Sequence, residues 1–228
     1  MNYSTVSADV ISYTSLLGEE KRKLETGIKE LLLDLTNKYK TYSFYGRLVQ
    51  GDYIECALKS PKYALRIALI LKTYIKKFEF NKKKEKRVRL KYFYEHGIRL
   101  AVAIAPLEKI DPEKGIIDGE AIYLSGRTIK NLSTYDKQKI VIKNTMFFCS
   151  NNKKLQEQFD TIFSLLDTIV SKCSAKQSEI IYYKLLGLSE KEISQKLNKY
   201  QSTISQHSTA AGWLSIEKAV IFFESTIQ

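Results

Sequence analysis

The sequence predicts an α/β domain followed by a small all-α domain. Strand and helix patterns alternate over the first two thirds of the 228 residues, and only helical patterns follow. The chain holds three prolines, ten glycines and 44% hydrophobic residues, which indicates a regularly folded protein. Alternation of strands with long helices favours helices packed on a sheet. We therefore expect an α/β domain at residues 1–148, a connecting helix at 149–173 and an all-α domain at 174–228.

The α/β domain begins with a predicted strand, a helix and a hairpin. Residues 3–12 are rich in β-branched side chains and have Asp9 near the end of the strand. Residues 19–39 have leucine and isoleucine at helical spacing, with acidic side chains in the first turn. The extended runs 43–50 and 53–58 are joined by a Gly-Asp pair, which predicts a β-hairpin.

The rest of this domain alternates helix and strand. A helix over residues 61–78 begins at a proline, which suits a first helical turn. A strongly apolar strand is expected at 98–104, a helix at 120–132 and a last short strand at 139–143. The predicted order is therefore strand, helix, hairpin, helix, strand, helix, strand.

One apolar stripe runs along the connecting helix, which we predict over residues 153–173. Its spacing is three, then four, then three, then four residues, and two heptads are too few to define a coiled coil. The stripe either packs on its own chain or forms a dimer contact, since symmetric DNA sites are often bound by dimers. The stripe consists of Phe159, Ile162, Leu166, Ile169 and Cys173.

Two capping boxes mark helix starts in the tail. Ser174 opens an S-x-x-Q box before a helix that stops at Gly187, and Ser189 opens an S-x-x-E box before a short second helix. A third, polar helix follows at 201–211, and we expect Ser215 to cap a final helix. A short helix, a tight turn and a polar helix in this order predict a helix-turn-helix.

The third helix has the side chains that DNA recognition needs. A helix-turn-helix lays this helix in the major groove, where glutamine pairs with adenine and serine or threonine contacts several bases. Ile204 is expected on the inward face. The predicted DNA-contacting residues are Lys199, Gln201, Ser202, Thr203, Ser205, Gln206 and His207.

Charge is distributed unevenly between the two parts. The formal net charge is +12, which suits a polyanionic partner, yet the chain from Lys172 onward has seven basic and five acidic residues. Phosphate contacts from the tail alone would therefore be few, so dimerisation or another basic segment would have to help. Residues 82–91 hold seven basic residues and one acid, and they are either a second nucleic-acid contact or a solvated connection.

Two carboxylates and an arginine in the α/β domain form a second candidate site. Asp9 ends the first strand and Asp52 lies at the hairpin tip, so the two face each other if these strands are neighbours. Paired carboxylates of this kind hold Mg²⁺ against a nucleotide phosphate. Arg127 lies in the helix at 120–132, where it is placed to reach a phosphate. The alternative is that both aspartates satisfy turns and caps.

Short motifs over residues 1–145 resemble the class III nucleotidyl cyclase domain. The matching pieces are Ala8-Asp-Val-Ile11, Gly51-Asp52, the strand at 98–104 and the run from Gly119 to Arg127. The resemblance implies a ferredoxin-like sandwich. It also implies that the two aspartates bind Mg or Mn with a nucleotide, and that the arginine stabilises the transition state of cyclisation.

A closer resemblance is to the SatD-like family, whose members are similar to the cyclases in fold and often end in a helix-turn-helix. The run from Asp118 to Arg127 is similar to the family's D-G-x-A-Y-x-x-A-R motif. The segment from Leu185 to Ile193 resembles the DNA-binding helices of sigma-factor region 4. These likenesses imply a nucleotidyl cyclase-type α/β sandwich followed by an all-α helix-turn-helix domain.

Departures from the cyclase pattern favour sensing over catalysis. Tyr123 stands where cyclases have asparagine, and Leu48 stands where they have the lysine that reads the base. Ala101 and Ala105 replace two glycines of a strand motif. The phosphate-handling residues are thus retained without the base-reading ones, which favours a nucleotide or metal sensor over a structural relic or an active cyclase.

Composition also excludes several classes of protein. Three cysteines at no metal-ligand spacing and two histidines argue against a zinc site, and an odd, sparse cysteine count fits the cytoplasm. No signal peptide or membrane-spanning segment is expected.

The sequence as a whole predicts a cytoplasmic, homodimeric DNA-binding transcriptional regulator. Its degenerate cyclase-like domain would sense a nucleotide or metal, with the connecting helix coupling the two parts. The alternatives are a divergent nucleotidyl cyclase with a targeting tail, and an adaptor that docks another protein through the tail.

Overall fold

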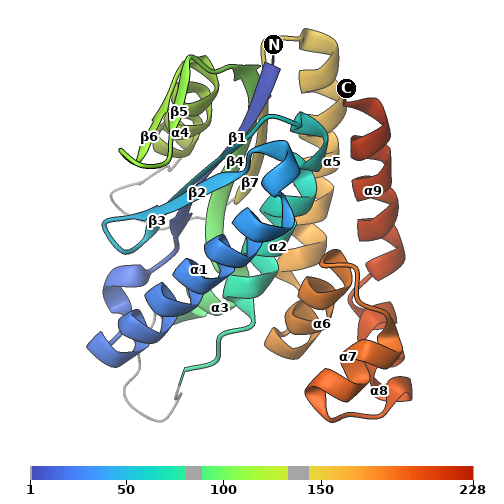
Figure 1. The fold of residues 1–228 in the computed structure, drawn as a ribbon. Helices are drawn as coiled ribbons and strands as arrows, with labels where there is room; N and C mark the ends of the chain where they lie inside the picture. The colour runs from blue at the N-terminus through green and yellow to red at the C-terminus, as the bar shows by residue number, and fades with distance from the viewer. Residues whose placement is uncertain (1, 81–88, 133–143, 228) are drawn as a thin grey trace.

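A computed structural model describes residues 2–80, 89–132 and 144–227 as a mixed α/β fold built on one five-stranded sheet (Figure 1). The strand order is β2-β3-β1-β4-β7. The central strand β1 is antiparallel to both of its neighbours, and β7 joins β4 in parallel. The strands are β1 (Asn2–Val10), β2 (Tyr45–Val49), β3 (Tyr53–Leu58), β4 (Ile98–Pro106) and β7 (Met146–Ser150).

Helices cover the two faces of the sheet unequally. The helices α1 and α2 lie on one face, while α4 and a two-stranded ribbon, β5 and β6, lie on the other (Figure 1). The helices of this part are α1 (Gly18–Lys38), α2 (Ala64–Lys76), α3 (Leu90–His96), α4 (Glu120–Leu132) and α5 (Lys153–Ser171). The ribbon strands are β5 (Lys109–Asp111) and β6 (Ile116–Asp118), and 3-10 turns occupy Tyr13–Ser15, Lys40–Tyr42 and Pro61–Tyr63.

Alternation along β1 decides which side chains meet which layer. Val6 and Ala8 are fully buried in the main hydrophobic core with α1 and α2. Thr5 and Ser7 point to the opposite face, where Thr5 Oγ1 donates to the carbonyl of Ala121 at 2.8 Å. Asp9 continues this second series, so it lies on the same face of the sheet as α4.

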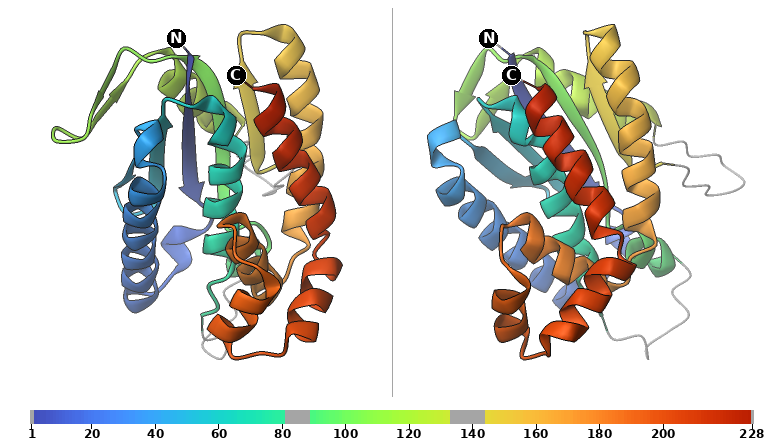
Figure 2. Two further views of the ribbon diagram at one scale, coloured as in Figure 1. Left: turned by 45° about the vertical axis from the view of Figure 1, so that its right-hand side comes forward. Right: turned by 90° about the vertical axis from the view of Figure 1, so that its right-hand side faces the viewer.

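Four helices follow α5 and form the tail. The helices α6, α7 and α8 lie at one end of the molecule, and α9 runs back beside α5 toward the other end, where both chain termini lie (Figure 2). The tail helices are α6 (Ala175–Leu185), α7 (Glu190–Leu197), α8 (Gln201–Ala210) and α9 (Trp213–Thr226).

The hydrophobic core continues from the sheet into the tail. Phe148 of β7, Phe159 of α5 and Phe223 of α9 pack together, with ring centroids 5.3 Å apart for the first pair and 4.7 Å apart for the second. Phe223 is fully buried. The last helix therefore completes the core of the α/β part.

The apolar stripe of α5 packs on its own chain. Phe159 and Leu166 are buried in the main core, whereas Ile162 and Ile169 are only partly buried. The buried face also includes Phe163, which the stripe omitted. Since these side chains already have intramolecular partners, the stripe offers little apolar surface to a second copy.

A buried polar cluster joins α2 to α5. Lys72 Nζ lies 3.2 Å from Asp167 Oδ1 and donates to Thr145 Oγ1 at 2.7 Å and to two backbone carbonyls. The Lys72 side chain is completely buried. Burial raises the pKa of Asp167, but Lys72 and the two hydrogen bonds from Thr145 outweigh this effect and leave the pKa below its usual value.

The structure confirms most of the predicted elements that it describes and differs from the prediction in a few details. The strand predicted at 139–143 lies outside the described residues, and the edge strand beside β4 is β7. The helix α3 was not predicted. The final helix begins at Trp213 after Gly212 in a left-handed conformation (φ 73°), so Ser215 is not its cap. Within the described residues, no helix combines the length and the apolar character needed to cross a bilayer.

Candidate functional site

An open groove of about 550 Å³ lies between α4 and the uncovered part of the sheet. Its floor is formed by Asp9 of β1, with Tyr53 and Glu55 of β3 and Arg99 of β4. Its wall is the face of α4 that includes Tyr123, Gly126, Arg127 and Lys130. The groove therefore brings together two of the three predicted residues, Asp9 and Arg127.

Hydrogen bonds fix α4 against the central strand. Ser125 Oγ lies 2.8 Å from Ser7 Oγ and 3.1 Å from Thr5 Oγ1. Ser125 is fully buried, so these contacts are shielded from water. They set the height at which Arg127, half a turn further along, stands over the groove.

Asp9 and Arg99 are cross-strand partners on β1 and β4. Arg99 Nη1 lies 3.7 Å from Asp9 Oδ2, while Asp9 Oδ1 is buried without a hydrogen-bond partner in the described structure. Burial raises the pKa of Asp9; the Arg99 guanidinium lowers it and the charge of Asp52 raises it again. The net result is a carboxylate that ionises less readily than a free one.

The remaining groove charges differ in how far they are compensated. Glu55 accepts a hydrogen bond from Arg47 Nε at 2.7 Å, so its charge is balanced from the neighbouring strand. The Arg127 guanidinium lies 6.0 Å from the centre of the Tyr123 ring and makes no ion pair within the described residues. The Tyr123 hydroxyl donates to Asp118. Arg127 is thus an exposed cation with unused hydrogen-bond donors.

Asp52 is not part of the groove. It lies in the turn between β2 and β3, and its carbonyl accepts the backbone N–H of Val10 at 2.9 Å. Burial raises the pKa of its carboxyl, and the charges that act on it from α1 are Lys21 and Glu25. Asp52 therefore interacts with Asp9 only through its charge.

This arrangement does not supply a metal site by itself. Within the described residues, no three His, Cys, Asp or Glu side chains converge as a metal site would require. Arg99 also occupies the neighbourhood of Asp9 Oδ2. Because Mg²⁺ takes six oxygen ligands, water or a bound phosphate would have to supply most of them beside Asp9 and Asp52.

Sequence reasoning missed the floor of the groove. Arg99 is the only charged residue in the apolar run of β4, and that isolation is a signal that it faces a polar environment. Tyr53 and Glu55 follow from the register of β3 against β1, which pairs Asp9 with Tyr53. No pattern in the sequence alone reveals that register.

The tail presents a second candidate surface, built on a small core of its own. Ile180, Ile193 and Ile204, one each from α6, α7 and α8, are at most 3% exposed and pack together. Both predicted capping boxes are formed, since Ser174 accepts from Gln177 N and Ser189 from Glu192 N. Asn198 ends α7 in a left-handed conformation (φ 50°), which turns the chain sharply toward α8.

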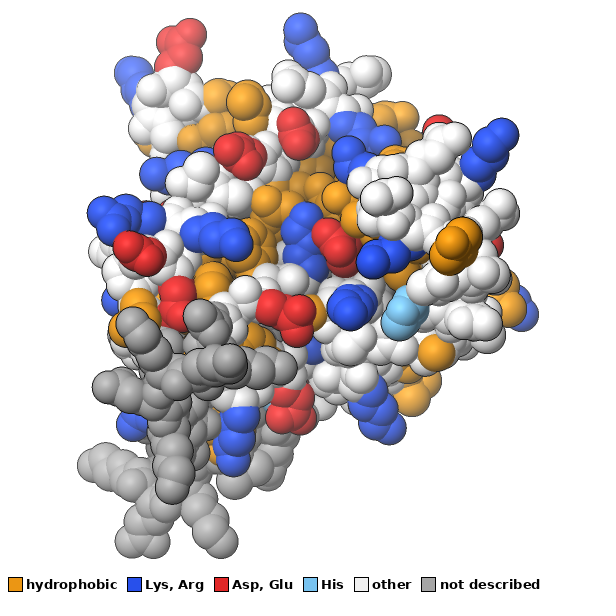
Figure 3. Space-filling view, turned by 90° about the horizontal axis from the view of Figure 1, so that it is seen from below, with side chains coloured by type: hydrophobic (Ala, Val, Ile, Leu, Met, Phe, Trp, Pro, Cys, Tyr) orange, Lys and Arg blue, Asp and Glu red, His pale blue; other side chains and the backbone are white. Residues whose placement is uncertain are grey.

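The predicted DNA-contacting residues lie on the outer side of this unit. Ile204 faces inward as expected. Thr203, Ser205 and His207 are half-buried on α8. The exposed members of the set are Lys199, Gln201, Ser202 and Gln206. Figure 3 views this end of the molecule and shows lysine and arginine side chains around a largely polar, uncharged surface on the side of α7 and α8.

Contacts with α1 and α2 hold the tail in place. Arg66 of α2 bonds both carboxylate oxygens of Glu224 on α9, at 2.6 and 3.1 Å, and also the carbonyl of Leu185 at 3.2 Å. Lys38 of α1 donates to the carbonyl of Leu186 at 2.9 Å. The outer side of α8 therefore has a fixed position relative to the sheet.

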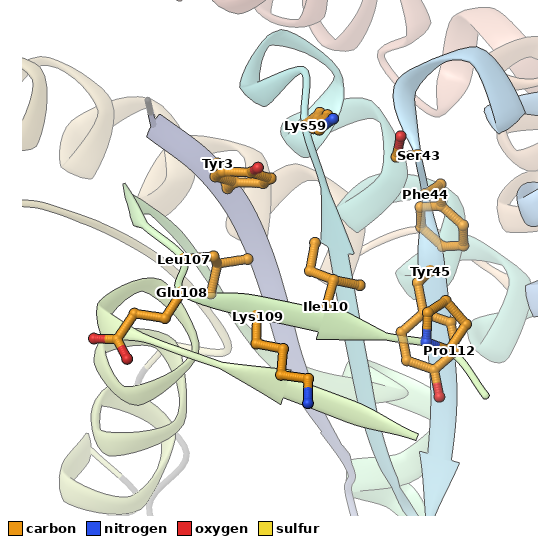
Figure 4. Close-up of a pocket in the computed structure, with 10 residues that line it drawn as sticks. All are labelled: Tyr3, Ser43, Phe44, Tyr45, Lys59, Leu107, Glu108, Lys109, Ile110 and Pro112. Atoms are coloured by element: carbon orange, nitrogen blue, oxygen red, sulfur yellow. The ribbon is translucent and has the colours of Figure 1, made fainter. Parts of the chain in front are cut away.

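A further pocket of about 320 Å³ separates the β5–β6 ribbon from the sheet edge (Figure 4). Figure 4 shows Leu107 and Ile110 beside the aromatic rings of Tyr3, Phe44 and Tyr45. Its charged side chains are Lys59, Lys109 and Glu108, and all three are exposed. Because no charged group is fixed inside it, this pocket has less chemical definition than the groove.

The basic segment at 82–91 falls largely outside the described residues.

Comparison of the chain with protein-family models, with curated proteins and with solved structures gave no match. The geometry of the groove and of the tail surface is therefore the basis for assigning a function.

Proposed function

We propose that the chain is a cytoplasmic DNA-binding transcriptional regulator, with a helix-turn-helix at 174–228 whose α8 reads the major groove. The observation that favours this function is the exposed polar side of α8, fixed over a small core shared with α6 and α7. In such a unit, contacts with base edges give sequence preference, and lysine contacts with phosphates give general affinity.

The decisive experiment is a binding-site selection with the purified full chain. An enriched sequence supports the proposal, and a selection that enriches nothing contradicts it. Gln206→Ala should relax the preference at one base position at a cost of about 1–3 kcal/mol. Lys199→Ala should weaken binding to all sequences alike and reduce the salt dependence.

Matched substitutions separate these effects from general damage. Gln195→Ala removes an exposed glutamine of α7, and Lys218→Ala removes an exposed lysine of α9. Both controls should leave the selected sequence and the affinity unchanged. An equally large loss of affinity in the controls would show that the effect is not specific to α8. It would contradict the assignment of α8 as the helix that reads DNA.

The second proposed activity is recognition of a phosphorylated ligand, such as a nucleotide, in the groove. Arg127 supports it because its exposed guanidinium, which has no ion pair among the residues that the structure describes, suits a phosphate. A bound phosphate would complete the ligands of a Mg or Mn ion held by Asp9 and Asp52. In this interpretation residues 1–148 are a divergent, ferredoxin-like cyclase sandwich of the SatD-like type. Apart from the short α3, the order strand, helix, two strands, helix, strand from β1 to β4 is consistent with it.

Calorimetry with nucleoside triphosphates and Mg²⁺ or Mn²⁺ tests this activity. Binding should weaken about tenfold or more in Arg127→Gln, because a charge-assisted hydrogen bond is lost. The variant Arg22→Gln, at an exposed position of α1, is the charge-matched control. Absence of binding, or binding unchanged by Asp9→Asn and Asp52→Asn, would rule the sensor out.

Two other activities remain as outcomes of these tests. Conversion of a labelled nucleoside triphosphate to a cyclic product, abolished by Asp52→Asn, would identify an enzyme. Binding to a protein in place of DNA would identify the tail as an adaptor. Sedimentation with and without the selected DNA would determine whether the regulator is a homodimer, as symmetric sites require.

A further inference from the structure

A pocket of about 330 Å³ lies where the tail meets α2. We call it the Trp213 pocket, after the only tryptophan of the chain. Its walls come from α2, from the turn between α6 and α7, from the first turn of α7 and from α9. The lining residues that matter below are Arg66, Lys184, Leu188, Glu192, Trp213, Glu217 and Ile221.

One wall of the Trp213 pocket is apolar and aromatic. Trp213 and Leu188 are partly buried, and Ile221 is 57% exposed beside them. Lys184 Nζ lies 5.3 Å from the centre of the Trp213 ring. The ring therefore already contacts one positive charge. Among aromatic side chains, tryptophan attracts cations most strongly.

Two glutamates also line the pocket: Glu217 lies between Trp213 and Ile221 along α9, and Glu192 lies in the first turn of α7. Both cations of the pocket are already paired, because Arg66 binds Glu224 and Lys184 Nζ lies 2.9 Å from Glu190. The carboxylate of Glu217 has no ion pair within the described part of the chain, and that of Glu192 accepts only hydrogen bonds from Ser189. Both carboxylates thus lack a positively charged partner among the described residues, and that of Glu217 also has no hydrogen bond to stabilise its charge, in a chain whose net charge is +12.

We propose that the Trp213 pocket binds a small organic cation with an apolar body, such as an alkylammonium or a quaternary amine. The positive group lies between the carboxylate of Glu217 and the ring of Trp213, and the apolar body packs against Leu188 and Ile221. A volume of about 330 Å³ is at the lower end of the range for small-molecule sites, which suits a ligand of this size.

Binding there has a consequence for the tail. The pocket has walls from α2 and from the first turn of α7, so a ligand contacts the α/β part and the proposed helix-turn-helix at once. It should therefore stabilise the docked position of α7 and α8. Only this consequence rests on the proposed DNA-binding function, and the binding itself does not.

Tryptophan fluorescence of the full chain, without DNA, tests the proposal. Titration with n-butylammonium and with choline should produce a saturable change in Trp213 emission, and n-butanol, which has a similar apolar body and no charge, should not. Glu217→Gln should weaken the affinity for both amines about tenfold, because the cation loses its charged partner. Glu157→Gln, at an exposed position of α5, should leave the affinity unchanged.

The outcomes are distinguishable from those of the DNA tests. No saturable change with either amine, an equal response to n-butanol, or an unaltered affinity in Glu217→Gln overturns the proposal. A thermal shift produced by the amines in the unsubstituted chain and lost in Glu217→Gln provides a second readout that does not depend on emission. If DNA binding fails while amine binding persists, the proposed DNA-binding function is wrong and the assignment of the Trp213 pocket still holds.

Discussion

At the residue scale, Lys76 of α2 links ionisation to stability. Its ammonium group donates to the carbonyls of Tyr94 at 2.9 Å and Ser171 at 3.3 Å, and also to that of Glu95. Burial, together with the nearby charge of Lys72, lowers the pKa of Lys76 to about 8. The folded chain therefore gives up this proton more readily than the unfolded chain does.

This shift predicts a rise in stability with pH. The pKa of Lys76 is about 8 in the folded chain and 10.5 in the unfolded chain. Its contribution to stability is therefore fully present above pH 10.5 and is lost as the pH falls through 8. Between these limits the wild-type chain should gain up to ~1.4 kcal/mol per pH unit relative to Lys76→Met. Urea unfolding of both proteins at several pH values measures the difference, and parallel pH profiles would contradict it.

The candidate residues of the groove were predictable only in part. Asp9 and Arg127 follow from strand and helix patterns that are local in sequence, and the structure places both in the groove. Asp52 was expected to face Asp9; its charge raises the pKa of Asp9, but Asp52 does not line the groove, and Lys21 and Glu25 of α1 also act on it. The neighbours that define the site, Tyr53 and Arg99, depend on a cross-strand register that no local pattern contains.

At the scale of elements, Asp167 attaches α5 to the rest of the fold. It pairs with the fully buried Lys72 and accepts from Thr145 Oγ1 at 2.6 Å, just before β7. Asp167→Asn should cost about 3–5 kcal/mol, because it leaves a buried ammonium group without its counter-charge. Asp160→Asn, an exposed substitution on the same helix, is the control and should change stability little. Equal unfolding midpoints for the two variants would show that the pair contributes nothing.

Helices were predicted better than strands for a physical reason. The caps at Ser174 and Ser189 and the periodicity of α4 are local signals that survive in the folded chain. The strand β7 pairs in parallel with β4, which is distant in sequence, and its Met-Phe-Phe-Cys run has no alternation. The helix α3 is seven residues long, too short for a periodic pattern to stand out.

At the scale of the whole molecule, the shared core predicts a single unfolding transition. The aromatic cluster around Phe223 joins α9, α5 and β7, so the tail and the sheet should lose structure together. Emission from Trp213 and far-ultraviolet circular dichroism should therefore give one midpoint in urea. Two separated midpoints would show that residues 174–228 unfold as an independent domain.

A substitution in that cluster sharpens the test. Phe223→Ala should cost about 3–5 kcal/mol and move both signals together, because it opens a cavity between the two parts. Phe222→Ala, at the neighbouring position where the ring is 42% exposed, should cost less. A Phe223→Ala variant that shifts only the tryptophan signal would contradict the shared core.

The two chain ends lie at the end of the molecule opposite α6, α7 and α8 (Figure 2). A biotin or a fluorescent protein joined to either end would stand far from the outer side of α8. Immobilisation by either terminus should therefore orient every copy with α8 toward the solution. Sensor chips or optical tweezers could then present this surface uniformly, without altering a single residue of the tail.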